Sequence, residues 1–327
     1  MRHVALVLAL LWSWCGVAAP VQRRAPAEPH GWLDLARWGA SRGLGARVGG
    51  KGLQLDLVGR STQISFLADS ARVVLDGTDI RLGTPIRRVG DRFLMSERDL
   101  QTTLQPLMSP PKRPATRPIR LVAINAGHGG KDPGNIEGRR QEKLYNLMVA
   151  GEARRALERA GLRVVMIRQD DTFVELESRA AKANNAKADL YVSLHFNAVQ
   201  GPGSREVHGV ETYCLTPAGA SSTNDSGHHG GGWHPGNRFD RDNIVLARMV
   251  HRAVTGGTEL EDRGVRRARF KELTLLDMPG VLVEGGYMTN PDDGRGIYTP
   301  EGRTQLARAI VDGVLAYKRL VERGAAE

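Results

Sequence analysis

The spacing of hydrophobic residues changes along the chain, and the change occurs at a proline-rich segment. Between residues 31 and 108, short runs such as LQLDLV, QISFL and RVVL alternate apolar and polar positions and are separated by DGT and GTP turns. This pattern is typical of short strands, so we expect a small β-rich domain over residues 31–108. Residues 109–118, SPPKRPATRP, contain four prolines and three basic residues. They are predicted to form a linker without regular structure.

From residue 119 onward, strand-like and helix-like periods alternate. Five apolar runs have the length of buried strands: IRLVAI, LRVVMI, DLYVSL, VETYCL and GVLVE. Helical spacing is found over residues 141–160, 174–186 and 244–254, and a closing helix begins at Thr299 and Pro300. In residues 141–160 we expect one face to point inward, formed by Leu144, Leu147, Met148, Ala153 and Leu157. The alternation predicts an α/β fold whose sheet is covered by helices on both faces.

The first residues have the pattern of an export signal. Met1, Arg2 and His3 precede the apolar run VALVLALLW, which small residues follow at positions 16–19. We interpret residues 1–18 as a cleaved signal peptide, the alternative being an uncleaved anchor helix. After cleavage we expect an exported protein of the periplasm or cell envelope, with no stable membrane insertion. One cysteine then remains, Cys214, which we expect to be a buried strand residue.

The formal net charge of +10 favours an anionic partner, such as nucleic acid or an acidic polymer of the cell wall. Export favours the wall polymer, and the arginines are spread along the chain rather than gathered in a basic arm. We therefore expect no nucleic-acid partner. A solvated basic surface without a charged partner is the alternative, and no oligomeric state is predicted.

A glycine-rich turn follows the first strand of the α/β part, in INAGHGGKDPG. It is not a P-loop, because Asn125 and Asp132 replace the first glycine and the serine or threonine of that motif. A dinucleotide fingerprint starting at Gly127 fails at Asp132 as well. The remaining interpretation concerns His128 itself. His195 follows another strand in the similar setting SLHFNA, and residues at the C-terminal ends of such strands meet in one crevice.

Two carboxylates complete the candidate site. Glu142 begins the predicted helix 141–160, where an acid also suits the helix dipole without any further role. Two histidines and one glutamate are nevertheless the ligand set of a catalytic zinc site that leaves room for water. Glu284 ends the apolar run VLVE, where a charge is costly without a partner. We therefore expect His128, Glu142 and His195 to bind Zn²⁺, and Glu284 to be the catalytic carboxylate that moves a proton.

Four ordered motifs, NAGHGGKDPG, EKLYNL, SLHFNA and VLVEGGYMTN, resemble those of the zinc-dependent N-acetylmuramoyl-L-alanine amidases of the Amidase_3 family. The resemblance covers residues 119–320 and implies an α/β/α sandwich as the catalytic domain. It implies hydrolysis of the amide between N-acetylmuramic acid and L-alanine in peptidoglycan. It also implies the same roles for His128, Glu142, His195 and Glu284. Asn125 stands where the family usually has Asp, and Asn197 is an orienting residue or makes a local turn.

Residues 75–108 resemble the copper amine oxidase N-terminal-like domain. Residues 31–108 contain no histidine and no cysteine, so we expect no copper site there. The expected role is attachment or substrate targeting, and an inert spacer is the alternative.

Other functions remain open at this point. Another zinc peptidase of wall peptides would share the metal ligands, whereas a catalytically silent peptidoglycan-binding module would lack a ligand or Glu284. Residues 215–243 contain His228, His229 and His234, which suggest a second metal site or, with so many glycines, a flexible loop near the cleft. The segment does not favour an autoinhibitory helix, so we expect constitutive hydrolysis.

Overall fold

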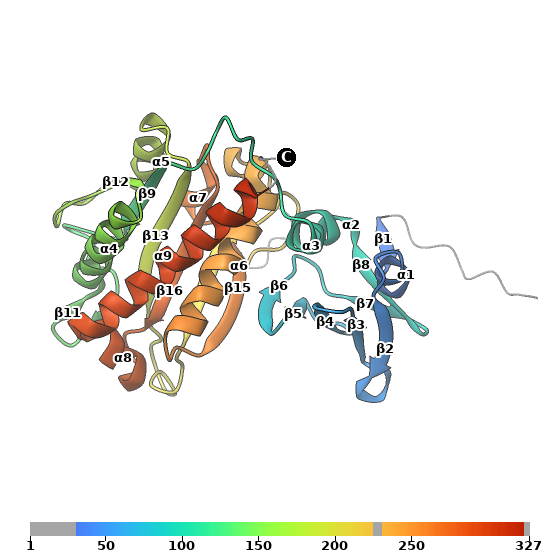
Figure 1. The fold of residues 1–327 in the computed structure, drawn as a ribbon. Coiled ribbons are helices and arrows are strands. Elements are labelled where there is room, and N and C mark those ends of the chain that lie inside the picture. Colours follow the sequence, from blue (N-terminus) through green and yellow to red (C-terminus); the bar gives the residue numbers. More distant parts are fainter. Residues whose placement is uncertain (1–30, 225–230, 324–327) are drawn as a thin grey trace, which may run out of the picture.

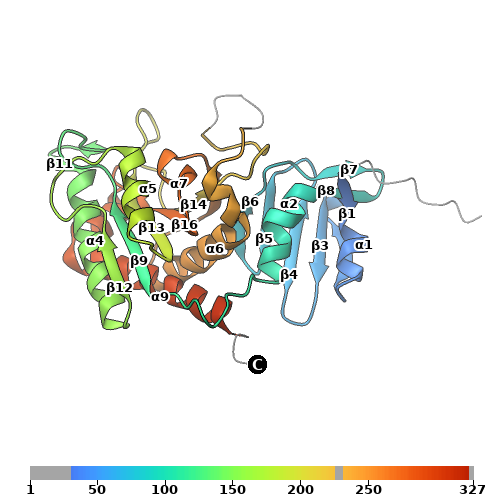
Figure 2. The same cartoon turned by 90° about the horizontal axis from the view of Figure 1, so that it is seen from above.

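The computed structural model describes residues 31–224 and 231–323. The predicted signal peptide lies outside these residues, as do His228 and His229. Within the described ranges, every helix is too short or too polar to cross a bilayer. An N-terminal β-rich part lies beside a larger layered part with a central sheet between helices, as Figures 1 and 2 show.

The central sheet runs through both parts of the molecule. Its strand order is β12-β9-β13-β16-β14-β15-β6-β5-β4-β3-β2. The layered part contributes β9 Leu121–Ala126, β12 Arg163–Met166, β13 Leu190–Asn197, β14 Val210–Leu215, β15 Asp262–Ala268 and β16 Gly280–Tyr287. β12, β9, β13 and β16 are parallel, whereas β14 is antiparallel to β16 and parallel to β15. The parallel strands therefore end at one edge, where the predicted site residues lie.

Helices cover both faces of this sheet, so the predicted α/β/α architecture is confirmed. α4 Glu142–Arg159, α6 Asp240–Gly257 and α9 Pro300–Glu322 pack together on one face (Figure 1). α5 Leu176–Asn185 and α7 Lys271–Thr274 cover the other face. Two core clusters reflect this division, because Val122 and Ile124 of β9 contribute to one and Ala123 to the other. The remaining short elements are the hairpin β10 Ile136–Glu137 and β11 Arg140–Gln141, the 3-10 helix η3 Pro235–Phe239 and α8 Pro291–Tyr298.

All five predicted strands are present, but β15 has no counterpart in the prediction. Its sequence, DRGVRRA, contains three arginines and gives no apolar alternation. Arg267 is nevertheless buried. A strand whose inward side chains include a guanidinium cannot be recognised from hydrophobicity alone.

The inward face predicted for residues 141–160 is partly wrong. Leu144 and Met148 are 39% and 47% exposed. The buried face of α4 contains polar residues in its first turns, and it is formed by Glu142, Lys143, Asn146, Val149, Ala150, Ala153 and Leu157. The apolar pattern misplaced this face because the functional residues occupy the inward positions near the N-terminus of the helix.

The N-terminal part is β-rich, as predicted. A three-stranded sheet contains β1 Trp32–Asp34, β7 Arg87–Val89 and β8 Arg92–Ser96. The remaining strands form an antiparallel meander of β2 Gly45–Gly49, β3 Gln54–Val58, β4 Gln63–Leu67, β5 Arg72–Leu75 and β6 Thr78–Arg81. Short helical elements accompany them: α1 Leu35–Ala40, η1 Gly50–Gly52, α2 Glu97–Asp99, the π-helix η2 Leu100–Leu104 and α3 Gln105–Met108.

The two parts meet at a buried junction. β6 pairs with β15 in parallel, with Ile80 opposite Val265. Arg267, 1% exposed, donates hydrogen bonds to the carbonyl of Leu215 on one side and to the carbonyl of Thr102 on the other. Residues 109–118 form no helix or strand, as their prolines predicted. The division of the chain into separate domains there stays a prediction.

Candidate active site

His128, Glu142 and His195 come together at the C-terminal edge of the parallel strands. One potential ligand atom from each lies within 4.8 Å of the others. Nε2 of His128 is 3.2 Å from one oxygen of Glu142, and Nδ1 of His195 is 3.1 Å from the other. β9 leads into His128, α4 begins with Glu142, and β13 carries His195. Three separate elements therefore build the cluster that the motifs predicted.

The glycines around His128 make this approach possible. A Cβ at position 127 would lie 2.1 Å from Cε1 of His195, so only glycine fits there. His128 itself has a φ of 61°, in the left-handed region that side chains rarely adopt. Arg179 holds this turn by donating a hydrogen bond to the carbonyl of His128. The backbone geometry thus places the imidazole at the cost of local strain, which is common at functional sites.

Glu142 is 1% exposed and is held by several hydrogen bonds. It accepts from the backbone and side-chain amides of Asn135, from the side chain of Asn146 and from the backbone of Phe196. Burial alone would raise the pKa of Glu142, but its hydrogen bonds and charge interactions with His128 and His195 hold that pKa well below its usual range. The carboxylate is therefore ionised and fixed in orientation before any metal binds.

Each histidine also faces a second carboxylate with its other nitrogen. Nδ1 of His128 is 2.7 Å from Asp132, and Nε2 of His195 is 3.5 Å from Glu272. Metal-bound histidines usually have such a carboxylate behind the ring, which fixes the tautomer. Two nitrogens and one carboxylate facing one point are the donor set of a catalytic zinc site. The residues present therefore fit a zinc ion.

Asn125 and Asn197 differ in their relation to this cluster. Asn125 is fully buried and donates to Ser193 and Glu272 while its side-chain oxygen accepts from Arg179. Asn197 instead accepts a local hydrogen bond from the backbone of Ala198 and lies 3.4 Å from Glu211. Of these two asparagines, only Asn125 belongs to the hydrogen-bond network behind the candidate ligands.

Glu284 lies on the strand next to His195, and the two residues are paired in register. Its Oε2 is buried without a hydrogen-bond partner among the described residues. Burial raises the pKa of Glu284 to about 8; the charge of His195 opposes this shift, and Glu142 and Glu211 add to it. A carboxyl group in this setting is poised to accept and release protons near neutral pH.

Neither Glu211 nor Glu272 was predicted from the sequence. Glu211 interrupts the apolar run VETYCL, which is the same kind of signal that identified Glu284. Glu272 lies in the four-residue helix α7 and has no comparable signal. The three remaining histidines of the described residues lie elsewhere, and His208 and His251 pair with Glu261 and Asp262.

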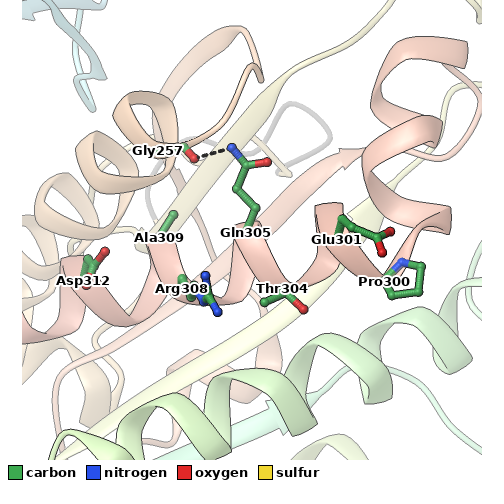
Figure 3. Close-up of a pocket in the computed structure, with 8 residues that line it drawn as sticks. All are labelled: Gly257, Pro300, Glu301, Thr304, Gln305, Arg308, Ala309 and Asp312. Atoms are coloured by element: carbon green, nitrogen blue, oxygen red, sulfur yellow. Dashed lines mark hydrogen bonds between the residues drawn. The ribbon is translucent and has the colours of Figure 1, made fainter.

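A separate groove of about 480 Å³ runs along α9 and the end of α6. Figure 3 shows its lining residues, among them Glu301, Arg308 and Asp312, and Gln305 donating a hydrogen bond to the carbonyl of Gly257. None of the four candidate site residues lines it. The groove therefore does not belong to the histidine and glutamate cluster.

Comparisons with known proteins agree on the layered part of the chain. A family model described as Amidase_3, N-acetylmuramoyl-L-alanine amidase, matches residues 122–316. The N-acetylmuramoyl-L-alanine amidase AmiC of Neisseria meningitidis serogroup B is 33% identical over 228 residues, which is 63% of this chain and 54% of that protein. AmiC of Escherichia coli is 30% identical over 246 residues, 67% of this chain and 58% of that protein. The chain thus spans little more than half the length of these two relatives.

Solved structures of N-acetylmuramoyl-L-alanine amidases are also similar to this chain. The catalytic domain of CwlV, an N-acetylmuramoyl-L-alanine amidase from Bacillus (Paenibacillus) polymyxa, is 31% identical with a TM-score of 0.50, covering 61% of this chain and 97% of that one. AmiC2 of Nostoc punctiforme is 32% identical with a TM-score of 0.51, covering 61% and 96%. Both similarities confirm the α/β fold.

Proposed function

Because this chain belongs to the Amidase_3 family of N-acetylmuramoyl-L-alanine amidases, we propose that it hydrolyses the amide between N-acetylmuramic acid and L-alanine in peptidoglycan. The observation that carries the proposal is Glu284, a half-buried acid on the strand next to His195 whose Oε2 is buried without a hydrogen-bond partner among the described residues. A purely binding module has no use for such a costly group. The presence of Glu284 together with all three candidate ligands therefore argues against a silent peptidoglycan-binding protein.

The proposed cofactor is Zn²⁺, held by Nε2 of His128, Nδ1 of His195 and the carboxylate of Glu142. A zinc ion bound there would supply Lewis acidity and lower the pKa of a bound water to about 7. Glu142 is already ionised and needs no proton loss to bind a cation. Asp132 and Glu272 face the outer nitrogens of the two histidines, so the inner nitrogens are left for the metal.

Glu284 is the proposed proton carrier. Its carboxylate takes a proton from the attacking water and passes it to the amino nitrogen of L-alanine, which leaves as the amide C–N bond breaks. A pKa near neutrality suits both steps, because a much stronger acid would not hold the proton and a much weaker one would not release it. Removal of the carboxyl group should therefore abolish turnover while the ligand cluster stays intact.

Export to the periplasm or cell envelope follows from the predicted signal peptide, and the substrate is found there. For residues 31–108 we propose a role in attachment or substrate targeting, without copper.

Digestion of purified peptidoglycan with the wild type and with Glu284→Gln, followed by mass spectrometry, tests the activity. The wild type should release stem peptides with a free N-terminal L-alanine, and the variant should release none while retaining its zinc by elemental analysis. Peptides cut only at other amides would favour a different zinc peptidase. Release of glycan fragments, or of nothing at all, would contradict the proposal.

A further inference from the structure

A buried polar cluster lies behind His195, on the side away from Glu142. At its centre is Glu272, 3% exposed, from the short helix α7. One oxygen of Glu272 accepts hydrogen bonds from the Asn125 amide at 2.8 Å and the Tyr191 hydroxyl at 3.3 Å. Its other oxygen accepts from Ser193 at 3.1 Å. Glu272 is therefore fixed by three donors in the interior of the protein.

The same carboxylate faces the unpaired nitrogen of His195. Oε1 of Glu272 is 3.5 Å from Nε2 of His195, and that nitrogen is buried with no hydrogen bond at all among the described residues. Nδ1 of the same ring points to Glu142, at 3.1 Å. Only a small shift of the ring would bring Nε2 within hydrogen-bond distance of Glu272. When the ring proton is on Nε2, Nδ1 carries no proton and its lone pair is free to bind the metal.

Arg179 belongs to the same buried cluster. Arg179 is 1% exposed and donates to the side-chain oxygen of Asn125 at 3.2 Å. The Asn125 amide therefore links the guanidinium on one side to Glu272 on the other. Asn125 has no carboxylate of its own, so within this group of contacts Glu272 is the acid that reaches His195.

We propose that Glu272 is a positioning residue that accepts a hydrogen bond from Nε2 of His195 and thereby presents Nδ1 to the zinc ion. The inference rests on the proposed function in that it assumes a metal held by His128, Glu142 and His195. Asn125, Ser193 and Tyr191 orient the carboxylate, and Arg179 in turn holds the side chain of Asn125. Loss of a carboxylate behind a ligating histidine typically weakens metal affinity by about 10- to 100-fold.

Zinc affinity, measured in competition with a chromophoric chelator and without substrate, tests the proposal on the full chain. Glu272→Gln should bind zinc about 10- to 100-fold more weakly than the wild type. With Co²⁺ in place of zinc, its visible absorption bands should also shift, because the coordination of His195 changes. Wild-type affinity and an unchanged cobalt spectrum in a folded Glu272→Gln would overturn the proposal.

Two further variants separate positioning from structural damage. Glu177→Gln is the matched control, because Glu177 is exposed and pairs with Lys271, the residue before Glu272; it should bind zinc like the wild type. Should Glu272→Gln fail to fold, Glu272→Asp decides, since it keeps the charge but shortens the reach by one methylene. It should bind zinc with intermediate affinity, and an affinity equal to the wild type would count against the proposal. Because no substrate is present, these outcomes are independent of whether the peptidoglycan assay succeeds.

Discussion

Glu211 of β14 lies directly opposite Glu284 of β16 in the antiparallel pair of strands. The two acids differ in how they are compensated. Glu211 accepts hydrogen bonds from Arg263 at 3.2 Å and from the Tyr213 hydroxyl at 2.8 Å. Oε2 of Glu284 has no hydrogen bond among the described residues. Besides burial, the neighbouring charge of Glu211 raises the pKa of Glu284.

Glu211→Gln should shift the activity profile to lower pH. Loss of this negative charge, with Arg263 still present, lowers the pKa of Glu284. Because Glu284 must be ionised to accept a proton, the acidic limb of kcat/KM against pH should move toward lower pH. Soluble muropeptides allow this profile to be measured. Glu301→Gln, on the exposed first turn of α9, is the control, and an identical acidic limb for wild type and Glu211→Gln would contradict the prediction.

Sequence patterns identified most of the architecture because local hydrophobicity determines most of these elements. The five apolar runs became strands, and the four predicted helices match α4, α5, α6 and α9 to within a few residues. β15 was missed because Arg267 points inward and finds its acceptors in Leu215 and Thr102, which are distant in sequence. The inward face of α4 was predicted wrongly for a related reason: Glu142 and Asn146 are buried in the polar candidate site and not in the hydrophobic core.

The candidate site shows the same limit. His128, His195 and Glu284 each follow a run of strand residues, so the chain itself marks them as lying at one sheet edge. Glu272 could not be predicted in this way. Its contact with His195 depends on how α7 packs against β13, and nothing in the sequence FKELTLL indicates that packing.

Removal of the metal should destabilise the protein. A ligand that binds only the folded state adds about 4 kcal/mol when its free concentration is a thousand times its Kd. Chelator-treated protein should therefore melt at a lower temperature, and added zinc should restore the original value. Differential scanning calorimetry measures both. Glu142→Gln should show no zinc-dependent change in melting temperature. Equal melting temperatures for the wild type with and without chelator would show that bound metal does not stabilise the fold.

Gly127→Ala should abolish tight zinc binding. The new methyl group would lie 2.1 Å from Cε1 of His195, so the imidazole must move away from Glu142. Zinc affinity should fall by more than about 10-fold. Displacing a ligand weakens metal affinity at least as much as removing the carboxylate that hydrogen-bonds that ligand. Gly151→Ala is the control on α4, where the added carbon makes only an ordinary contact at 3.7 Å. It should bind zinc normally and be slightly more stable.

Arg267→Leu should weaken the junction between the two parts of the molecule. The change removes this donor from the buried carbonyl of Leu215 and the partly buried carbonyl of Thr102, at a cost of about 1–3 kcal/mol for a buried group left unsatisfied. Urea denaturation should show a midpoint well below that of the wild type. Arg47→Leu, at an exposed position of β2, should leave the midpoint nearly unchanged. Equal midpoints for the two variants would mean that Arg267 does not secure the junction.

Asp240→Asn should stabilise the protein at high pH only. Burial raises the pKa of Asp240 to about 6, against 3.8 as its ordinary value, although a hydrogen bond from Asn237 opposes the shift. An acid whose pKa is higher in the folded state costs stability as pH rises through the interval from about 4 to about 6, and the cost stays constant above it. A neutral asparagine of the same shape removes this cost, which is at most about 3 kcal/mol. Urea denaturation at pH 4 and pH 8 should therefore give equal stabilities for wild type and variant at pH 4, and a more stable variant at pH 8. A gain of the same size at both pH values would show that the effect does not come from the charge of Asp240.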